Sequence, residues 1–122
     1  MINHVSIQVR DVAGSAAFYD AVLAPLGGAR LMDFGDVIGY GTSRPEFWLG
    51  PTETSGEARE IHLAFTASDR AAVVAFHDAA VAAGAEVLHA PRLFPEYHVT
   101  YFGAFVRDPD GNNVEAVCHE PE

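Results

Sequence analysis

Two stretches of the chain alternate apolar and polar residues with the period of a β-strand. Val5, Ile7 and Val9 alternate with His4, Ser6 and Gln8, and Ile61, Leu63 and Phe65 alternate with His62, Ala64 and Thr66. Successive side chains of a strand point to opposite faces, so this pattern predicts two strands, each with one apolar face. It also predicts that His4 and His62 lie on the less apolar faces.

Each predicted strand is followed by an alanine-rich segment with helical periodicity. Phe18, Val22 and Leu26 recur every four residues, and Val73, Phe76 and Ala80 recur every three or four. This spacing predicts two amphipathic helices whose apolar sides cover the strands. The helices are expected to end near Gly27 and Gly84, because glycine is the preferred residue just after a helix.

The segments after each helix predict further strands. Residues 33–40, 46–50, 101–107 and 113–119 have strand-like composition. The last two are joined by Asp108-Pro109-Asp110-Gly111-Asn112, where proline and glycine favour a tight turn. We interpret this turn as a hairpin. Each half of the chain is therefore expected to contain a strand, a helix and about three further strands.

The two halves are related by an internal repeat. A shift of 58 residues places His4 on His62, Asp11 on Asp69 and Phe18 on Phe76. With about nine additional loop residues in the second half, Val114-Glu115-Ala116 matches Phe47-Trp48-Leu49. We define the two modules as residues 1–52 and 60–119, joined by a linker over residues 50–59 that is rich in Gly, Ser, Thr and Glu.

Composition limits the class of protein. The 122 residues suit one domain, and half of them is too few for a good separate core, so the modules must pack together or on a partner. One cysteine excludes an intrachain disulfide, and we expect no secretory leader because the pattern predicts a strand almost from Met1. With no membrane-length apolar run, we expect a cytoplasmic protein. The net charge of −10 opposes binding to nucleic acid.

These features resemble the vicinal oxygen chelate superfamily, the glyoxalase, bleomycin-resistance and extradiol-dioxygenase group. The resemblance rests on His4, Phe18-Tyr19, Ile61-His62-Leu63 and the closing segment 108–115, and it covers nearly the whole chain. It implies an α+β fold of two βαβββ modules whose mixed, curled sheets surround a shared cavity.

The resemblance also implies metal ligands at the first and last strands of each module. Carried over by position, these are His4, His62 and Glu115. Trp48 stands where a fourth ligand is often found, and indole has no lone pair for a metal. Glyoxalase I-type isomerases generally need a carboxylate there. Two imidazoles and one carboxylate leave open positions, which suits Fe(II) or Mn(II), with Zn(II) or Ni(II) as further candidates.

The segment 95–101 contains two candidate catalytic residues, His98 and Tyr101. Extradiol dioxygenases, which the closing segment resembles, have a tyrosine ten residues before the final glutamate, where this chain has Phe105. Tyr101 lies on the same strand face four residues earlier, so His98 and Tyr101 could form a displaced acid–base pair. The other interpretation is a loop histidine and a cavity-lining tyrosine. We expect Trp48, Phe105 and Tyr40 to line the cavity and bind substrate.

We therefore expect a metal-dependent enzyme with dioxygenase-like or glyoxalase-like lyase or isomerase chemistry. Its substrate would be small, hydrophobic or planar, and would chelate the metal through vicinal oxygens. The alternative is a non-catalytic dimer that sequesters a drug, as bleomycin-resistance proteins do. Thiol-transferring fosfomycin-resistance enzymes share the ligand set, but they hold a phosphonate with several basic groups, and this chain has no lysine.

Small members of this family usually form homodimers in which the first module of one chain meets the second module of the other. By that resemblance, His4 would come from one subunit, and His62 with Glu115 from its partner. Packing of both modules within one chain is the other arrangement, and a linker of about ten residues does not decide between them.

Overall fold

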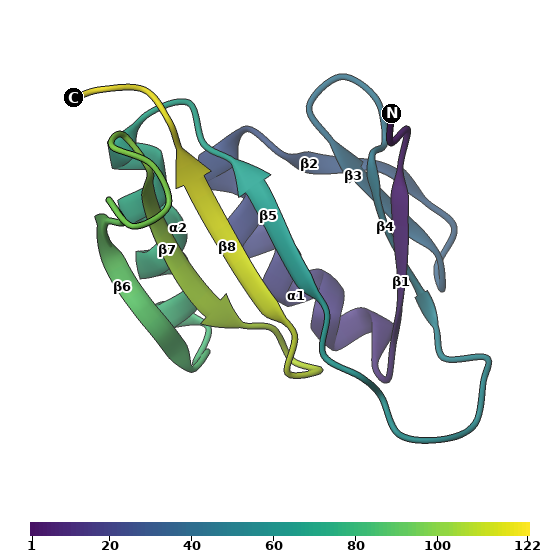
Figure 1. The fold of residues 1–122 in the computed structure, drawn as a ribbon. Helices are drawn as coiled ribbons and strands as arrows, with labels where there is room; N and C mark the ends of the chain where they lie inside the picture. Colours follow the sequence, from purple (N-terminus) through teal and green to yellow (C-terminus); the bar gives the residue numbers. More distant parts are fainter.

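The chain consists of two modules with the same order of elements, and a computed structural model describes all residues from 1 to 122 (Figure 1). The first module contains β1 (Val5–Val9), α1 (Val12–Leu23), the short 3-10 helix η1 (Ala24–Leu26), β2 (Ala29–Asp33), β3 (Ile38–Gly41) and β4 (Phe47–Pro51). The second contains β5 (His62–Thr66), α2 (Arg70–Ala82), β6 (Val87–Leu93), β7 (Phe102–Arg107) and β8 (Asn113–Cys118). The predicted α+β fold of two βαβββ modules is confirmed.

Each module forms its own four-stranded mixed sheet. Sheet A has the order β1-β4-β3-β2, and sheet B has the order β5-β8-β7-β6. In both sheets the first and last strands of the module are parallel neighbours, and the other pairs are antiparallel. Ser6 is paired with Trp48, and Ala64 is paired with Glu115. The register therefore places Trp48 and Glu115 at equivalent positions, as the shifted repeat match predicted.

The repeated aspartates begin the two helices. Oδ1 of Asp11 accepts a hydrogen bond from the Gly14 amide, and Oδ1 of Asp69 accepts one from the Ala72 amide. These side chains satisfy backbone donors that a helix N-terminus leaves free. Gly84 follows α2 with a φ of +83°, where glycine is tolerated best. Neither helix has the length and apolar character needed to cross a lipid bilayer.

The core lies between the helices and the inner faces of both sheets. Helices α1 and α2 pack against each other behind the sheets (Figure 1). The Tyr19 ring lies 4.8 Å from the Phe47 ring, which in turn lies 5.2 Å from the Phe65 ring of the second module. One continuous aromatic contact therefore joins the modules within the chain.

The turn at residues 108–112 does more than join two strands. The buried Asp108 carboxylate accepts hydrogen bonds from the Tyr19 hydroxyl and from the amide of Asn112. Nε of Arg10 donates to Oδ1 of Asp110 at 2.9 Å. The turn is therefore bonded to the first module, and interpreting it as a hairpin alone was incomplete.

The segment 33–40, which composition predicted as one strand, contains a chain reversal. β2 ends at Asp33 and β3 begins at Ile38. Oδ1 of Asp33 accepts a hydrogen bond from the Gly35 amide at 2.8 Å, and Gly35 has a φ of +90°. An aspartate that bonds two residues ahead, followed by a glycine with positive φ, stabilises a tight turn here instead of extended chain.

Candidate functional site

His62 and Glu115 meet on the open face of sheet B. They lie on the neighbouring parallel strands β5 and β8, and Nε2 of His62 is 2.5 Å from Oε1 of Glu115. The carboxylate is acceptor-only when ionised, so the imidazole donates this bond. The Glu115 side chain is only 2% exposed, whereas that of His62 is 53% exposed. The exposed His62 imidazole therefore lies between the buried Glu115 carboxylate and solvent.

The other oxygen of Glu115 is bonded to Tyr101. The hydroxyl of Tyr101, which lies in the loop between β6 and β7, donates a 2.6 Å hydrogen bond to Oε2. Burial, followed by the bond to Glu115 and its charge, raises the pKa of Tyr101 above its usual value. The phenol therefore stays protonated at neutral pH and remains a hydrogen-bond donor.

His98 lies outside this group. Its Nδ1 is 3.0 Å from the Thr100 hydroxyl oxygen, and the residue is exposed. The structure thus brings Tyr101, but not His98, to Glu115. His119 lies beside this group, because its ring centroid is 5.1 Å from that of Tyr101, and sequence analysis did not single it out. The sequence contains a signal for this placement, because His119 follows Glu115 by four residues. Residues an even number apart along a strand point to the same face.

An aromatic cluster forms the wall beside the pair. Phe105 is paired with Glu115 on β7, and its ring lies 5.9 Å from the His62 ring. Phe94 from the loop covers Phe105 at 5.2 Å, and the His89 ring approaches Phe105 at 5.3 Å. Both Phe94 and Phe105 are buried. Phe105 thus lies next to the pair, and neither Phe94 nor His89 was expected from the sequence.

Tyr40 lies on the helix side of sheet A, where it lines the cavity between the modules, and its role in substrate binding stays a prediction. Its ring is 1% exposed within the core, and its hydroxyl donates to the Ala16 carbonyl and to Oδ1 of Asp20. On β3, Gly39 lies on the open face, where it is paired with Trp48. The neighbouring residue must therefore point to the helices, because successive strand residues alternate between faces.

His4 is separated from the other two predicted ligands. It precedes β1, is exposed, and its Nδ1 lies 2.8 Å from the side-chain oxygen of Asn3. Within one chain, no group of three or more His, Cys, Asp or Glu side chains lies close enough to hold a metal ion. Strands β1 and β5 are both edge strands and are not paired with each other. Each therefore has one row of backbone groups without a strand partner.

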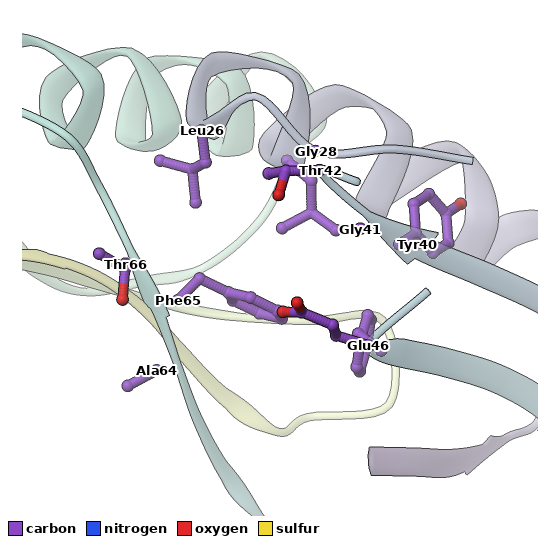
Figure 2. Close-up of a pocket in the computed structure, with 11 residues that line it drawn as sticks. Leu26, Gly28, Tyr40, Gly41, Thr42, Glu46, Ala64, Phe65 and Thr66 are labelled. Atoms are coloured by element: carbon purple, nitrogen blue, oxygen red, sulfur yellow. The ribbon is translucent and has the colours of Figure 1, made fainter. Parts of the chain in front are cut away.

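A cavity of about 320 Å³ lies between the modules (Figure 2). Leu26, Thr42 and Glu46 of the first module face Phe65 of the second across it. None of the three predicted metal ligands lines this cavity. The candidate site is therefore the His62–Glu115 pair, which does not line this cavity.

Comparison with known proteins agrees with the geometry. A family model described as "Glyoxalase/Bleomycin resistance protein/Dioxygenase superfamily" matches residues 1–116. The chain belongs to this superfamily. A search of curated proteins with this chain found no match.

Solved structures with the same fold include a glyoxalase/bleomycin resistance protein from Albidiferax ferrireducens T118. It is 28% identical, with a TM-score of 0.84 and coverage of 95% of this chain and 97% of that one. A lactoylglutathione lyase from Agrobacterium tumefaciens is 22% identical, with a TM-score of 0.69 and coverage of 97% and 92%. The fosfomycin resistance protein FosX from Mesorhizobium loti is 15% identical, with a TM-score of 0.69 and coverage of 97% and 91%. The last two show the fold alone.

Proteins of the glyoxalase superfamily are often metal-dependent, and the donors of this member partly fit a metal ion. His62 and Glu115 offer an imidazole nitrogen and a carboxylate oxygen that already converge. Such donors suit divalent first-row metals. Two protein ligands are too few for a typical catalytic site, which has about three. A catalytic metal at this pair would therefore need a third ligand from a residue that this chain alone does not bring to it.

Proposed function

We propose that this protein is a metal-dependent enzyme whose site forms between two subunits of a homodimer. His62 and Glu115 of one chain would hold the metal together with His4 of the other. The observation that carries the proposal is the almost complete burial of Glu115 beside a solvent-facing histidine. Both oxygens of this carboxylate already have hydrogen-bond partners, His62 and Tyr101, and a divalent metal would add the full positive charge that offsets the cost of burying it.

The edge strands support the shared site. β1 follows directly after His4, β5 begins at His62, and each is the free edge of its sheet. A second copy related by a twofold axis could place β1 of one chain beside β5 of the other, and would do so twice. This arrangement would pair the free edges and bring His4 toward the His62–Glu115 pair.

The proposed reaction acts on a small hydrophobic or planar molecule that chelates the metal through two vicinal oxygens. The bound ion would act as a Lewis acid and stabilise negative charge that develops on substrate oxygen. Tyr101 is positioned to donate a proton or a hydrogen bond beside Glu115. His98 is the second acid–base candidate, with a less direct position. Fe(II) or Mn(II) is favoured by the donor set, and Zn(II) or Ni(II) is also compatible.

The alternative function is ligand binding without chemistry. Two features favour it: the exposed ring of Tyr97 beside that of Tyr101, and a net charge of −10 that would attract a cationic drug. Such binding would persist after chelator treatment. A phosphonate substrate has less support, because Arg44, Arg92 and Arg107 each already pair with a glutamate.

Two mutant chains test the shared site directly. His4→Ala and His62→Ala chains are co-expressed with different tags, and the mixed dimer is isolated and analysed for metal. In a shared site, the mixed dimer keeps one complete ligand set and should bind about one metal ion per dimer, whereas each pure variant binds none. If each site lies within one chain, the mixed dimer has no intact site.

The matched control is His77→Ala. His77 lies on α2 and contacts Asp78, away from the predicted ligands, so its loss should leave metal content unchanged. Wild-type protein that binds no Fe(II), Mn(II), Zn(II) or Ni(II), yet binds an aromatic cation in excess chelator, would replace the enzyme proposal with the binding function.

A further inference from the structure

The only tryptophan of the chain lies with the face of its ring against a glycine. A β-carbon built on Gly39 would be 2.8, 2.8 and 2.9 Å from Cη2, Cζ3 and Cε3 of Trp48. These are three consecutive ring atoms at nearly equal distances, so the β-carbon position lies over the face of the six-membered ring and not at its edge. The missing side chain at residue 39 therefore allows the indole to lie flat on sheet A.

Gly39 is explained by the space that the Trp48 ring occupies, and not by an unusual backbone conformation. Gly39 is not among the residues with positive φ, so its backbone would accept other residues. The equivalent residue of the second module is Phe105, because Gly39 pairs with Trp48 as Phe105 pairs with Glu115. In the first module the position equivalent to Glu115 holds the aromatic Trp48, and its partner on the next strand is a glycine. In the second module that position holds Glu115 itself, and its partner is the aromatic Phe105.

The surroundings of Trp48 leave the indole partly uncovered. Its neighbour on β1 is the small residue Ser6, and Gly50 follows two residues later on the same strand face. A β-carbon on Gly50 would meet no atom within 4 Å. Trp48 is of intermediate exposure although β4 is a central strand. A large planar surface is therefore presented on the side of the sheet that carries His4.

We propose that Trp48 is a stacking platform that restricts the substrate to molecules with a planar conjugated ring. This inference rests on the proposed function, because it assumes that the open face of sheet A borders the metal site. An exposed indole face binds a flat ring through dispersion and offset stacking. A saturated ring with the same pair of oxygens could chelate the metal but could not stack in this way.

The single tryptophan makes the platform measurable. Fluorescence of the dimer is titrated with catechol and with cyclohexane-1,2-diol, which share vicinal oxygens and differ in planarity, with metal present and again with excess chelator. Catechol should change Trp48 emission in a saturable way, and the diol should not. By equilibrium dialysis, Trp48→Leu should weaken catechol binding roughly three- to tenfold, and Trp48→Phe should keep most of the affinity.

Gly39→Ala provides a test that leaves the indole in place. Its methyl group would press into the ring face, so Trp48 should tilt, its emission should shift, and catechol affinity should fall as in Trp48→Leu. Gly50→Ala adds the same methyl group where nothing is within 4 Å, and it should leave Trp48 emission unchanged.

The outcomes separate this inference from the enzyme proposal. Metal-loaded protein that binds catechol and the diol equally, or binds neither, overturns the platform and leaves the metal site standing. Catechol binding that depends on Trp48 in a protein that takes up no metal supports the platform and removes the enzyme proposal. Equal catechol affinity in wild type and Trp48→Leu overturns the platform whatever the metal content.

Discussion

The Tyr19 hydroxyl of the first module donates a 2.6 Å hydrogen bond to Oδ2 of Asp108 in the second module. Asp108 also accepts a bond from the Asn112 side chain, so its buried carboxylate is held by groups from both modules. The contact fixes the β7–β8 turn against α1. It therefore sets the position of β8, which carries Glu115, relative to the first module of the same chain.

Tyr19→Phe is expected to destabilise the protein by about 1.5–3 kcal/mol, the usual effect of removing a hydrogen bond to a charged group. The ring still fills the core, so the loss arises from the missing hydrogen bond to a buried carboxylate and not from a cavity. Urea unfolding measures the difference. Tyr97→Phe is the control, because the exposed Tyr97 has no side-chain hydrogen bond through its hydroxyl. Equal stability of the Tyr19→Phe and wild-type proteins would show that the bond is not important.

Alkaline pH should unfold the protein through three tyrosines. Burial is the largest cause that raises the pKa of Tyr19, Tyr40 and Tyr101, and a neighbouring carboxylate adds to it in each case. Below pH about 10 the phenols are protonated in both the folded and unfolded states, so the stabilisation is fully present. Above that pH the unfolded chain releases protons that the folded chain retains. Stability should then fall with rising pH, by up to about 1.4 kcal/mol per unit for the buried Tyr19 and by less for Tyr101, whose phenol is only partly buried and screened by solvent.

Thermal unfolding between neutral pH and pH about 11 checks this expectation, with tyrosinate absorbance recorded in parallel. Absorbance from the buried phenols should rise together with unfolding and not before it. The Tyr19→Phe protein should lose stability less steeply with pH. A flat stability profile through this range would contradict the expectation.

The internal repeat was the most informative part of the sequence. It predicted the equivalence of Trp48 and Glu115 that the strand register shows. This prediction rests on period-two alternation and on repeated residues, which are local properties of the sequence. The β-strand faces of the two histidines follow from the same alternation.

Other features depend on contacts that no local pattern encodes. Tyr40 lies on the helix side of sheet A because the Gly35 turn sets where β3 begins, and so which residues face the helices. The bond between Tyr101 and Glu115 depends on how a loop folds back on the sheet. The separation of His4 from Glu115 depends on how two modules pack, which a linker of ordinary length leaves open.

Acid pH should act through Asp20. A hydrogen bond from the Arg30 guanidinium is the main cause that lowers the pKa of Asp20, and the Tyr40 hydroxyl contributes a further bond. The stabilisation is present above the unfolded pKa of about 3.9 and is lost as the pH falls through the lower folded value. Arg30→Gln should therefore reduce stability at neutral pH, and the difference from wild type should shrink in strong acid. Unfolding at several pH values measures it, and a difference that is constant with pH would contradict this role.

Tyr101→Phe tests the acid–base assignment at the proposed metal site. The substitution keeps the ring and removes only the hydroxyl that donates to Oε2 of Glu115. If Tyr101 handles a proton in the reaction, turnover should fall by roughly 10²- to 10⁴-fold, while metal content stays near that of the wild type. KM should change little, because the aromatic contacts with Phe94 and Tyr97 remain.

His98→Gln is the companion variant, and its effect should be smaller, because His98 does not contact Glu115. Loss of metal in Tyr101→Phe would instead assign the hydroxyl to positioning the carboxylate, and an equal loss of turnover in both variants would show that His98 and Tyr101 act as a pair.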